Sequence, residues 1–374
     1  MIEVPQSERP RASLVMVTWN AVEWSRRAIA SIVDETQSPY ELIIVDNAST
    51  DATRDFFRAD LRGATIVLND DNFGFGVAAN LGAARAKAPV IVFVNSDVVV
   101  RAGWLEPLCL AIERDPDVAA AGPAIFDLEK RLDHAGALLA HDGWGMHYGR
   151  GEPMRAEYAF PRCVDYVSGA CLAVRGRAFH DTGGFDPWFQ TAYFEDADLG
   201  LRFTSLGWKV VYEPASVVTH AGGASGTAEG SLRLLAINHP RFYQRWSDLL
   251  KSRPEAPLTA RPERILGARD AVASGTILLI GDGSGAAREL ARSIATIAPN
   301  VRITLVGEQL PVAENVDALS GDWLHTRRFH YDIVAGGEGT HESSIRATQP
   351  LARRLTLNEF RQSVESTLVS AGIA

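Results

Sequence analysis

Carboxylate side chains gather in two short stretches of this chain of 374 residues. The first, Val94-Asn95-Ser96-Asp97, follows an apolar run that begins at Pro89, which places Asp97 at the carboxyl end of a predicted buried strand. Ligands of open α/β sheets bind beyond such strand ends. Divalent cations that bridge two phosphates take carboxylate oxygens as ligands. Asp97 is therefore a candidate ligand for Mg²⁺ or Mn²⁺ on a diphosphate, with a helix cap as the alternative.

The second stretch, Glu195-Asp196-Ala197-Asp198, precedes a predicted helix over residues 199–206. Neighbouring carboxylates raise one another's pKa, which favours a general base that works near neutral pH. The same residue types are common in the solvated first turn of a helix, where free N–H groups and the helix dipole favour negative charge. The residues alone leave both interpretations open.

Polar residues also end other predicted strands. Asn20 and Asp46 follow the first two strands, and His220 ends the last one, directly before a segment that contains Gly222 and Gly223. Loops at one edge of a sheet converge in space, and glycines let a backbone approach a phosphate closely. Asp46 is suited to accept hydrogen bonds from a nucleobase or a ribose, although turn chemistry explains the same residue. We expect these side chains to form one site.

The elements that position these residues follow from periodicity. Short apolar runs rich in β-branched residues alternate with helical patterns, which predicts an α/β fold with a mostly parallel, doubly wound sheet and flanking helices. The predicted strands are residues 13–18, 40–45, 64–68, 89–94, 119–126, 166–174, 208–212 and 217–220. Further predicted helices are residues 22–33, 77–86, 104–114, 177–182 and 233–250. Residues 127–162 show no clear periodicity.

The chain divides into two predicted domains, residues 1–250 and a small Rossmann-like α/β unit at 273–374, joined by a linker at 251–272 that contains prolines. In the small unit, Gly281-Asp282-Gly283-Ser284-Gly285 follows a strand and resembles a dinucleotide or methyl-donor loop, with Ala286 at the third glycine position. Glu308, at the next strand end, is a candidate ribose contact. The unit is either a structural or protein-contact module or a second ligand site.

Composition limits the class of protein. The hydrophobic content of 46% and charged content of 22% are ordinary for a globular protein, and the net charge of −9 argues against a large nucleic-acid surface. Three cysteines without a CxxC spacing argue against a disulfide framework or structural zinc. The polar N-terminus lacks the apolar core of a signal peptide. We expect a cytoplasmic protein, peripheral at most to the inner face of the membrane, where residues 241–246 either meet lipid or pack as a helix.

Six motifs follow one another along the first domain. They are Val17-Thr18-Trp19-Asn20, Ile44-Val45-Asp46-Asn47-Ala48-Ser49-Thr50-Asp51, Asn72-Phe73-Gly74-Phe75-Gly76 with Asn80-Leu81-Gly82, Val94-Asn95-Ser96-Asp97, Gly183-Gly184-Phe185-Asp186 and Phe194-Glu195-Asp196-Ala197-Asp198-Leu199. In this order they resemble glycosyltransferase family 2, and the chain looks like its bacterial rhamnosyltransferase-like branch. The resemblance covers roughly residues 12–250.

The resemblance implies a GT-A fold, with a nucleotide-binding half followed by an acceptor half, and inverting transfer from a nucleoside diphosphate sugar linked to UDP, dTDP or GDP. Asp97 would bind a divalent metal, with His220 as a second ligand, and Asp196, beside Glu195, would be the catalytic general base. Asp46 would bind the base or ribose. The other implied donor-nucleotide residues are Thr18, Asn20, Asn47, Ser49, Asn72, Asn80 and Ser96.

One departure concerns the metal. Asn95 stands where the family's Asp-x-Asp motif has its first Asp. The neutral amide removes a negative charge, so metal binding would be weaker or depend more on His220.

The irregular stretch is the expected acceptor region. Trp144, together with Asp198, is our candidate for acceptor contacts. His134, His141 and His147 lack a metal-binding spacing, and we interpret them as acceptor-loop or surface residues.

We therefore expect a metal-dependent, inverting hexosyltransferase that moves a rhamnose-like or other hexose to a hydroxyl of a glycan or lipid-linked glycan, in polysaccharide or cell-envelope assembly. One alternative is a degenerate nucleotide-sugar-binding module, in which Asn95 has abolished turnover. The other assigns the activity to the C-terminal unit, as a methyltransferase-like or nucleotide-dependent enzyme.

Overall fold

The chain forms two compact units in a computed structural model. Unit 1 consists of Met1–Met154 and Arg162–Pro257, and unit 2 consists of Arg155–Pro161 and Leu258–Ala374. The described residues are 1–154, 158, 161–189, 191–222, 228–253, 275–299, 301–308, 316–319, 331–339, 341–343, 345, 349 and 352–373. The predicted linker lies outside them, apart from residues 251–253. The predicted domain limits stay a prediction.

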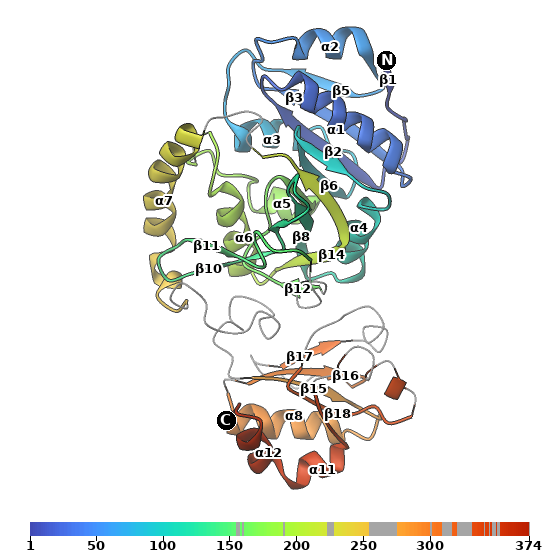
Figure 1. The fold of residues 1–374 in the computed structure, drawn as a ribbon, viewed down its shortest axis with the longest axis vertical. Coiled ribbons are helices and arrows are strands. Elements are labelled where there is room, and N and C mark those ends of the chain that lie inside the picture. Colours follow the sequence, from blue (N-terminus) through green and yellow to red (C-terminus); the bar gives the residue numbers. More distant parts are fainter. Residues whose placement is uncertain are drawn as a thin grey trace. The chain divides into compact units, whose positions relative to one another are not determined.

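Unit 1 is built on a ten-stranded sheet (Figure 1). Its main path runs through β12 (Arg162–Cys163), β14 (Lys209–His220), β8 (Val118–Phe126), β13 (Cys171–Arg175), β6 (Val90–Asn95), β2 (Ala12–Thr18), β3 (Tyr40–Asp46) and β5 (Thr65–Leu68). β7 (Val98–Val100) pairs with β14, and β9 (Leu132–His134) pairs with β8. Two small sheets pair β1 (Ile2–Glu3) with β4 (Leu61–Arg62) and β10 (Ala137–Leu139) with β11 (Gly145–His147).

Helices cover both faces of this sheet. They are α1 (Val22–Glu35), α2 (Thr53–Asp60), α3 (Phe75–Ala83), α4 (Leu105–Arg114), α5 (Gly176–Asp181), α6 (Glu195–Ser205) and α7 (Ala228–Leu250). Ile29 of α1 and Leu105 of α4 share a core cluster with Leu14 of β2. On the other face, α3 lies so close to β2 that a Cβ on Gly82 would be 2.4 Å from Cγ1 of Val15. The run of small residues in α3 therefore permits the close packing.

The α/β prediction is confirmed, and β6, β2, β3 and β5 are parallel as predicted. The rest of the sheet is mixed, because β13 runs antiparallel to both β6 and β8. The strand predicted at 166–174 begins only at Cys171, since the preceding residues turn and Cys171 N–H donates to Ser168 O.

Two more predictions need correction. The strands predicted at 208–212 and 217–220 are one strand, β14, with a register shift between Glu213 and Val217. Residues 127–162 are not irregular throughout, because β9, β10 and β11 lie within them.

Helix α7 completes unit 1. In the segment 241–246, Phe242 is fully buried and the side chains of Arg245 and Trp246 donate hydrogen bonds to Asp198, so this segment packs as part of a helix. Beyond the helix, Arg253 Nη2 pairs with the buried Asp165 Oδ1 at 2.9 Å. Among the described helices, none is both long enough and apolar enough to cross a membrane.

Unit 2 contains a five-stranded parallel sheet in the order β17 (Val316–Leu319), β16 (Val301–Val306), β15 (Gly275–Ile280), β18 (Ile333–Gly336) and β19 (Arg353–Leu355). Its helices include α8 (Ala286–Ile297), α11 (Leu357–Gln362) and α12 (Val364–Ser370). In chain order the strands run 3-2-1-4-5, as in one doubly wound arrangement. The α/β class of this unit is as predicted, while its Rossmann-like assignment and its role stay predictions.

Candidate active site

The predicted strand ends meet along one edge of the unit 1 sheet. Thr18, at the end of β2, pairs with Asp46 of β3, and Val17 pairs with Asn95 of β6. His220, at the end of β14, pairs with Val98, which directly follows Asp97. Residues that are far apart in the sequence are thereby brought together, Asp46 and Asn95 through the neighbouring strands β3, β2 and β6, and His220 through the pairing of β14 with β7.

Asp46 is fully buried and has one paired and one free oxygen. Its Oδ2 accepts from Arg54 Nε at 2.5 Å and from Ser49 N–H at 3.2 Å. Its Oδ1 is buried and has no hydrogen-bond partner among the described residues. Because an unsatisfied buried acceptor is costly, this oxygen is suited to a ligand N–H or O–H.

Asn20 and Ser49 join the ends of β2 and β3. Asn20, with the positive φ of 50°, donates its N–H to Ser49 Oγ at 2.9 Å, and its Oδ1 accepts from Thr50 N–H at 2.7 Å. Thr18 Oγ1 lies 2.9 Å from Ser25 Oγ. These side chains shape the loops around Asp46, and their contact with a nucleotide stays a prediction.

The remaining amides among the predicted nucleotide residues hold loops. Asn47 binds Asn72 Oδ1 at 2.7 Å through Nδ2, and its Oδ1 accepts from Phe73 N–H and Asn69 Nδ2. Asn80 binds the backbone of Phe185 twice, donating to its O at 2.7 Å and accepting from its N–H at 2.9 Å. The structure thus gives Asn47, Asn72 and Asn80 supporting roles, and nucleotide contact is untested for them.

A carboxylate–imidazole–carboxylate row follows β6. His220 Nε2 lies 3.2 Å from Asp97 Oδ1, and His220 Nδ1 lies 3.5 Å from Asp133 Oδ2. Although burial disfavours the imidazolium, the hydrogen bonds with Asp133 and Asp97 raise the pKa of His220 to about 9. The hydrogen bond from His220 lowers the pKa of Asp133 to about 2. Ser96, beside Asp97, is buried.

This row fits a divalent metal at Asp97 and His220. Neighbouring ligands of an octahedral ion with bonds of about 2.1 Å are roughly 3 Å apart, close to the Asp97–His220 separation. Metal-bound histidines usually donate their other N–H to a carboxylate, the position that Asp133 occupies. Within the described ranges, no group of three or more His, Cys, Asp or Glu residues could hold a metal ion.

The acidic stretch begins α6 rather than preceding it, so the predicted helix starts earlier than expected. Thr191, Tyr193 and Phe194, directly before it, have φ of 64°, 75° and 73°. Such backbone in non-glycine residues is uncommon and concentrates at functional sites. Phe75 N–H donates to Thr191 O at 2.7 Å, so the first residue of α3 supports this segment.

Asp196 and Glu195 have no cationic partner among the described residues. Gly169 N–H donates to Asp196 Oδ2 at 3.0 Å, and Ala197 N–H donates to Oδ1 at 2.8 Å. Burial raises the pKa of Asp196 against these two donors. Burial and then the charge of Asp196 raise the pKa of Glu195, whose Oε2 is buried without a hydrogen bond. A carboxylate with raised proton affinity suits a general base.

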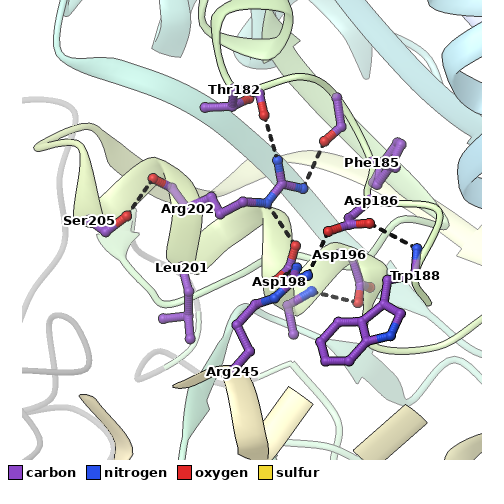
Figure 2. Close-up of polar contacts among 12 residues, drawn as sticks. Thr182, Phe185, Asp186, Trp188, Asp196, Asp198, Leu201, Arg202, Ser205 and Arg245 are labelled. Atoms are coloured by element: carbon purple, nitrogen blue, oxygen red, sulfur yellow. Dashed lines mark hydrogen bonds and ion pairs between the residues drawn. The ribbon is translucent and has the colours of Figure 1, made fainter. Parts of the chain in front are cut away.

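Asp198 is different, as Figure 2 shows. It is fully buried, its Oδ2 accepts from Arg202 Nε at 2.7 Å, and its Oδ1 accepts from Arg245 Nη1 at 2.9 Å. Trp246 Nε1 also donates to Oδ1, at 3.0 Å. Arg202 also donates to the carbonyl oxygens of Thr182 and Gly184. The prediction that Asp198 contacts the acceptor therefore needs correction, because its oxygens are enclosed by α6 and α7.

The irregular stretch holds one exposed and two enclosed candidates. Trp144 is 42% exposed, stacks on His239 and packs on Phe194, and its acceptor role stays a prediction. His134 is buried, and its Nδ1 lies 2.8 Å from Nδ1 of the partly buried His147. Of the two alternatives, acceptor-loop or surface residue, the surface alternative is wrong for His134. His147 is partly buried, and burial lowers its pKa to about 4.

The side chain of Glu308 occupies backbone N–H groups that follow the glycine-rich loop of unit 2. Glu308 Oε1 accepts from Gly285 N–H at 3.1 Å, and Oε2 accepts from Arg288 N–H at 3.0 Å. These N–H groups at the start of α8 are the ones that a cofactor phosphate would use. Glu308 therefore caps a helix, which does not favour its predicted contact with a ribose.

Sequence reasoning missed Asp133, Arg54 and Gly169. Each acts through a partner far along the chain or through its backbone, so residue type and spacing carried no signal for Asp133 or Gly169. Arg54 lies eight residues after Asp46, on the next helix, and its charge opposite a buried carboxylate was a usable signal.

Comparisons with known proteins identify the family of the chain. The profile of "Glycosyl transferase family 2" matches residues 13–171. The N-acetylglucosaminyl-diphospho-decaprenol L-rhamnosyltransferase of Mycobacterium tuberculosis is 31% identical over 253 residues, which cover 62% of this chain and 82% of that protein. The pre-mycofactocin glycosyltransferase of the same organism is 31% identical over 176 residues, covering 45% of this chain and 36% of that protein.

A solved structure of GalNAc-T7 with UDP, GalNAc and Mn²⁺ is also similar, at 18% identity and a TM-score of 0.47. The similarity covers 65% of this chain and 52% of that chain, so this protein spans about half of the solved one.

Proposed function

The chain belongs to glycosyltransferase family 2 and is a glycosyltransferase, and from this premise we propose that it transfers a hexose with inversion from a nucleoside diphosphate sugar to a hydroxyl of a glycan or lipid-linked glycan. The observation that carries the proposal is the pairing of Asp97 with His220 at the strand ends. The similar rhamnosyltransferase supports a rhamnose-like sugar and a lipid-linked acceptor.

The donor nucleotide binds at the ends of β2 and β3 in this proposal. The free Oδ1 of Asp46 accepts an N–H of the base or a hydroxyl of the ribose, while Arg54 and Ser49 hold its other oxygen in place. Ser49 and Asn20 fix the adjoining loops, and Thr18 holds α1 through Ser25. The nucleotide is thereby oriented with its diphosphate towards Asp97.

Asp97 and His220 would hold a divalent metal, Mg²⁺ or Mn²⁺, and Asp133 would orient the imidazole. Such an ion neutralises the charge that develops on a departing diphosphate. Asn95 supplies an amide where the family's motif has a carboxylate, so His220 carries more of the binding.

Asp196 acts as the general base. It accepts the proton of the acceptor hydroxyl, whose oxygen forms a bond to the anomeric carbon from the face opposite the diphosphate. The bond between that carbon and the diphosphate oxygen breaks, and the nucleoside diphosphate leaves with the electron pair. Inversion follows from this opposite-face attack. Glu195, beside it, favours proton uptake by Asp196 through its negative charge when ionised.

Trp144 is the proposed acceptor contact, because it is exposed and packs on Phe194 at the start of α6. The cytoplasmic location, peripheral membrane contact and a protein partner of unit 2 remain predictions. The second candidate function is a degenerate nucleotide-sugar-binding module that has lost turnover. Asn95 favours it, since the motif then lacks one carboxylate.

Thermal unfolding with UDP, dTDP, GDP and S-adenosylmethionine, each with and without Mn²⁺, tests the proposal. A ligand at a hundred times its Kd stabilises a two-state protein by about 2.7 kcal/mol. We expect one nucleoside diphosphate to raise the Tm, more strongly with Mn²⁺, and Asp97→Asn to remove the Mn²⁺-dependent part.

Asp181→Asn, an exposed carboxylate on α5, is the matched control and should respond as the wild type does. A response to S-adenosylmethionine alone would contradict the proposal and move the chemistry to unit 2. A response to a nucleoside diphosphate without turnover of any donor sugar favours the degenerate binding module.

A further inference from the structure

Asp196 is oriented by backbone groups. Its Oδ1 accepts from Ala197 N–H at 2.8 Å and its Oδ2 from Gly169 N–H at 3.0 Å. Ala197 belongs to α6 itself and moves with Asp196. Among the described residues, Gly169 therefore supplies the hydrogen bond that fixes this carboxylate relative to the rest of unit 1.

Gly169 lies in a turn that is held from a third element. Cys171 N–H donates to Ser168 O at 3.2 Å, which closes the turn, and Ser168 N–H donates to His134 Nε2 at 3.1 Å. His134 ends β9 and is 2% exposed. The adjacent N–H groups of Ser168 and Gly169 thus connect a buried imidazole with the carboxylate of Asp196.

The hydrogen bond from Ser168 N–H determines which ring nitrogens of His134 and His147 carry a proton. A backbone N–H only donates, so His134 Nε2 accepts and its Nδ1 carries the proton. That proton is donated to His147 Nδ1 at 2.8 Å, which leaves the proton of His147 on Nε2, 3.3 Å from the hydroxyl of Tyr166. A Cβ on Gly145 would lie 1.9 Å from this hydroxyl, so the glycine leaves room for the ring.

Burial is the main reason why both imidazoles are neutral, and the charge of Arg150 adds to it while that of Asp133 opposes it. Burial and then His147 lower the pKa of His134, Arg150 lowers it further, and only Asp133 and a backbone contact oppose this. Asp196 is faced by Glu195 from its own helix, whose pKa the charge of Asp196 raises. It is also faced by Tyr166, which burial keeps protonated by raising its pKa. The histidines therefore hold the turn without exchanging a proton with the base.

We propose that His134 is a positioning residue for Asp196, acting through the turn at Ser168 and Gly169. The inference rests on the proposed role of Asp196. The Gly169 bond favours the ionised carboxylate and so lowers the pKa of Asp196 against burial. If His134 no longer accepts from Ser168, this bond weakens and the pKa of Asp196 rises.

The test compares His134→Asn with His134→Gln in the full-length protein. Gln places an oxygen near the position of Nε2, whereas the shorter Asn does not reach Ser168. We expect the titration of Asp196, followed by NMR of [¹³Cγ]Asp-labelled protein and assigned with Asp196→Asn, to move to higher pH in His134→Asn and to stay near wild type in His134→Gln. The exposed His180→Asn is the control.

Hydrogen exchange gives a second readout. The Gly169 amide should lose roughly tenfold protection in His134→Asn, the size expected for one hydrogen bond. If that variant does not fold, hydrogen exchange of the wild-type protein tests the proposal. The proposal requires the hydrogen bonds of the Ser168 and Gly169 amides to open together, so the two amides should show similar protection from exchange.

An unchanged titration in a folded His134→Asn, or a Gly169 amide that exchanges much faster than that of Ser168, overturns the inference. Failure of the proposed function has a different signature, since Asp196→Asn would then retain turnover whatever His134 does.

Discussion

Asp196 and Asp198 lie two residues apart in the first turn of α6, yet their surroundings are opposite. Asp198 receives hydrogen bonds from two arginines and an indole, all from the side where α6 meets α7 and the turn at Gly184. Among the described residues, Asp196 receives only backbone N–H groups, and burial raises its pKa. On one face of the turn, Asp198 is neutralised by arginines and fixes the helix in place. On the other face, Asp196 is a carboxylate with a raised proton affinity.

The difference teaches that an acidic cluster is not one functional group. Buried charges persist when they are paired, and removal of one partner is strongly destabilising. A general base needs the reverse, a carboxylate without a cation beside it. The same Asp→Asn exchange at the two positions should therefore affect different quantities.

Asp196→Asn should have the largest effect. We expect kcat to fall about 10²- to 10⁴-fold, the usual contribution of general acid–base catalysis, while nucleoside diphosphate binding stays nearly unchanged. Release of nucleoside diphosphate from the sugar donor measures turnover, and calorimetry measures binding. Near-wild-type turnover would show that Asp196 is not the general base. The functional difference between Asp196 and Asp198 would then disappear.

Asp198→Asn should instead act on stability. Loss of the carboxylate leaves Arg202 and the partly buried Arg245 without this counter-charge, so the free energy of unfolding should fall by about 3 kcal/mol. Urea unfolding followed by circular dichroism measures it. A variant that unfolds at the wild-type urea concentration but fails to turn over would mean that Asp198, too, belongs to the reaction.

Glu195→Gln should have the smallest effect of the three substitutions, and it acts on the pH dependence of stability. The pKa of Glu195 is raised in the folded state, so its contribution to stability is present below the unfolded pKa and is lost as pH rises through the folded pKa. Gln does not ionise and avoids this loss. Unfolding experiments across pH should show the variant more stable by about 1–3 kcal/mol at pH 8 and equal to wild type near pH 4. Equal stability at both pH values would show that Glu195 is not strained by burial.

Much of the fold was predictable because burial leaves a direct trace in sequence. β2, β3 and β6 are buried on both faces, and each reads as a continuous apolar run that ends in the polar residues of the site. The GT-A type fold predicted for this part agrees with the family match and with the mixed sheet. The antiparallel direction of β13 was not predictable, since a strand has the same periodicity in either direction.

The candidate site was predictable to the level of strand ends. Asp46, Asp97 and His220 could be grouped because neighbouring strands end at one edge. Asp133 and the arginine partners of Asp198 could not, because their contacts depend on how a loop and α7 return to the sheet. Asn47 and Asn80 were assigned to the nucleotide on the motif alone, which carried no signal for the loop contacts that their side-chain amides make.

The ion pair of Arg253 with Asp165 defines where a minimal catalytic fragment can be cut. Burial raises the pKa of Asp165 to about 6 even with Arg253 beside it, and Leu139 N–H also binds this carboxylate. A fragment that stops at Leu250 keeps all of α7 but leaves Asp165 buried without its cation. Secondary structure alone would place the end of the fragment at Leu250, the last residue of α7. The ion pair moves this end three residues further, so that the smallest useful fragment includes Arg253.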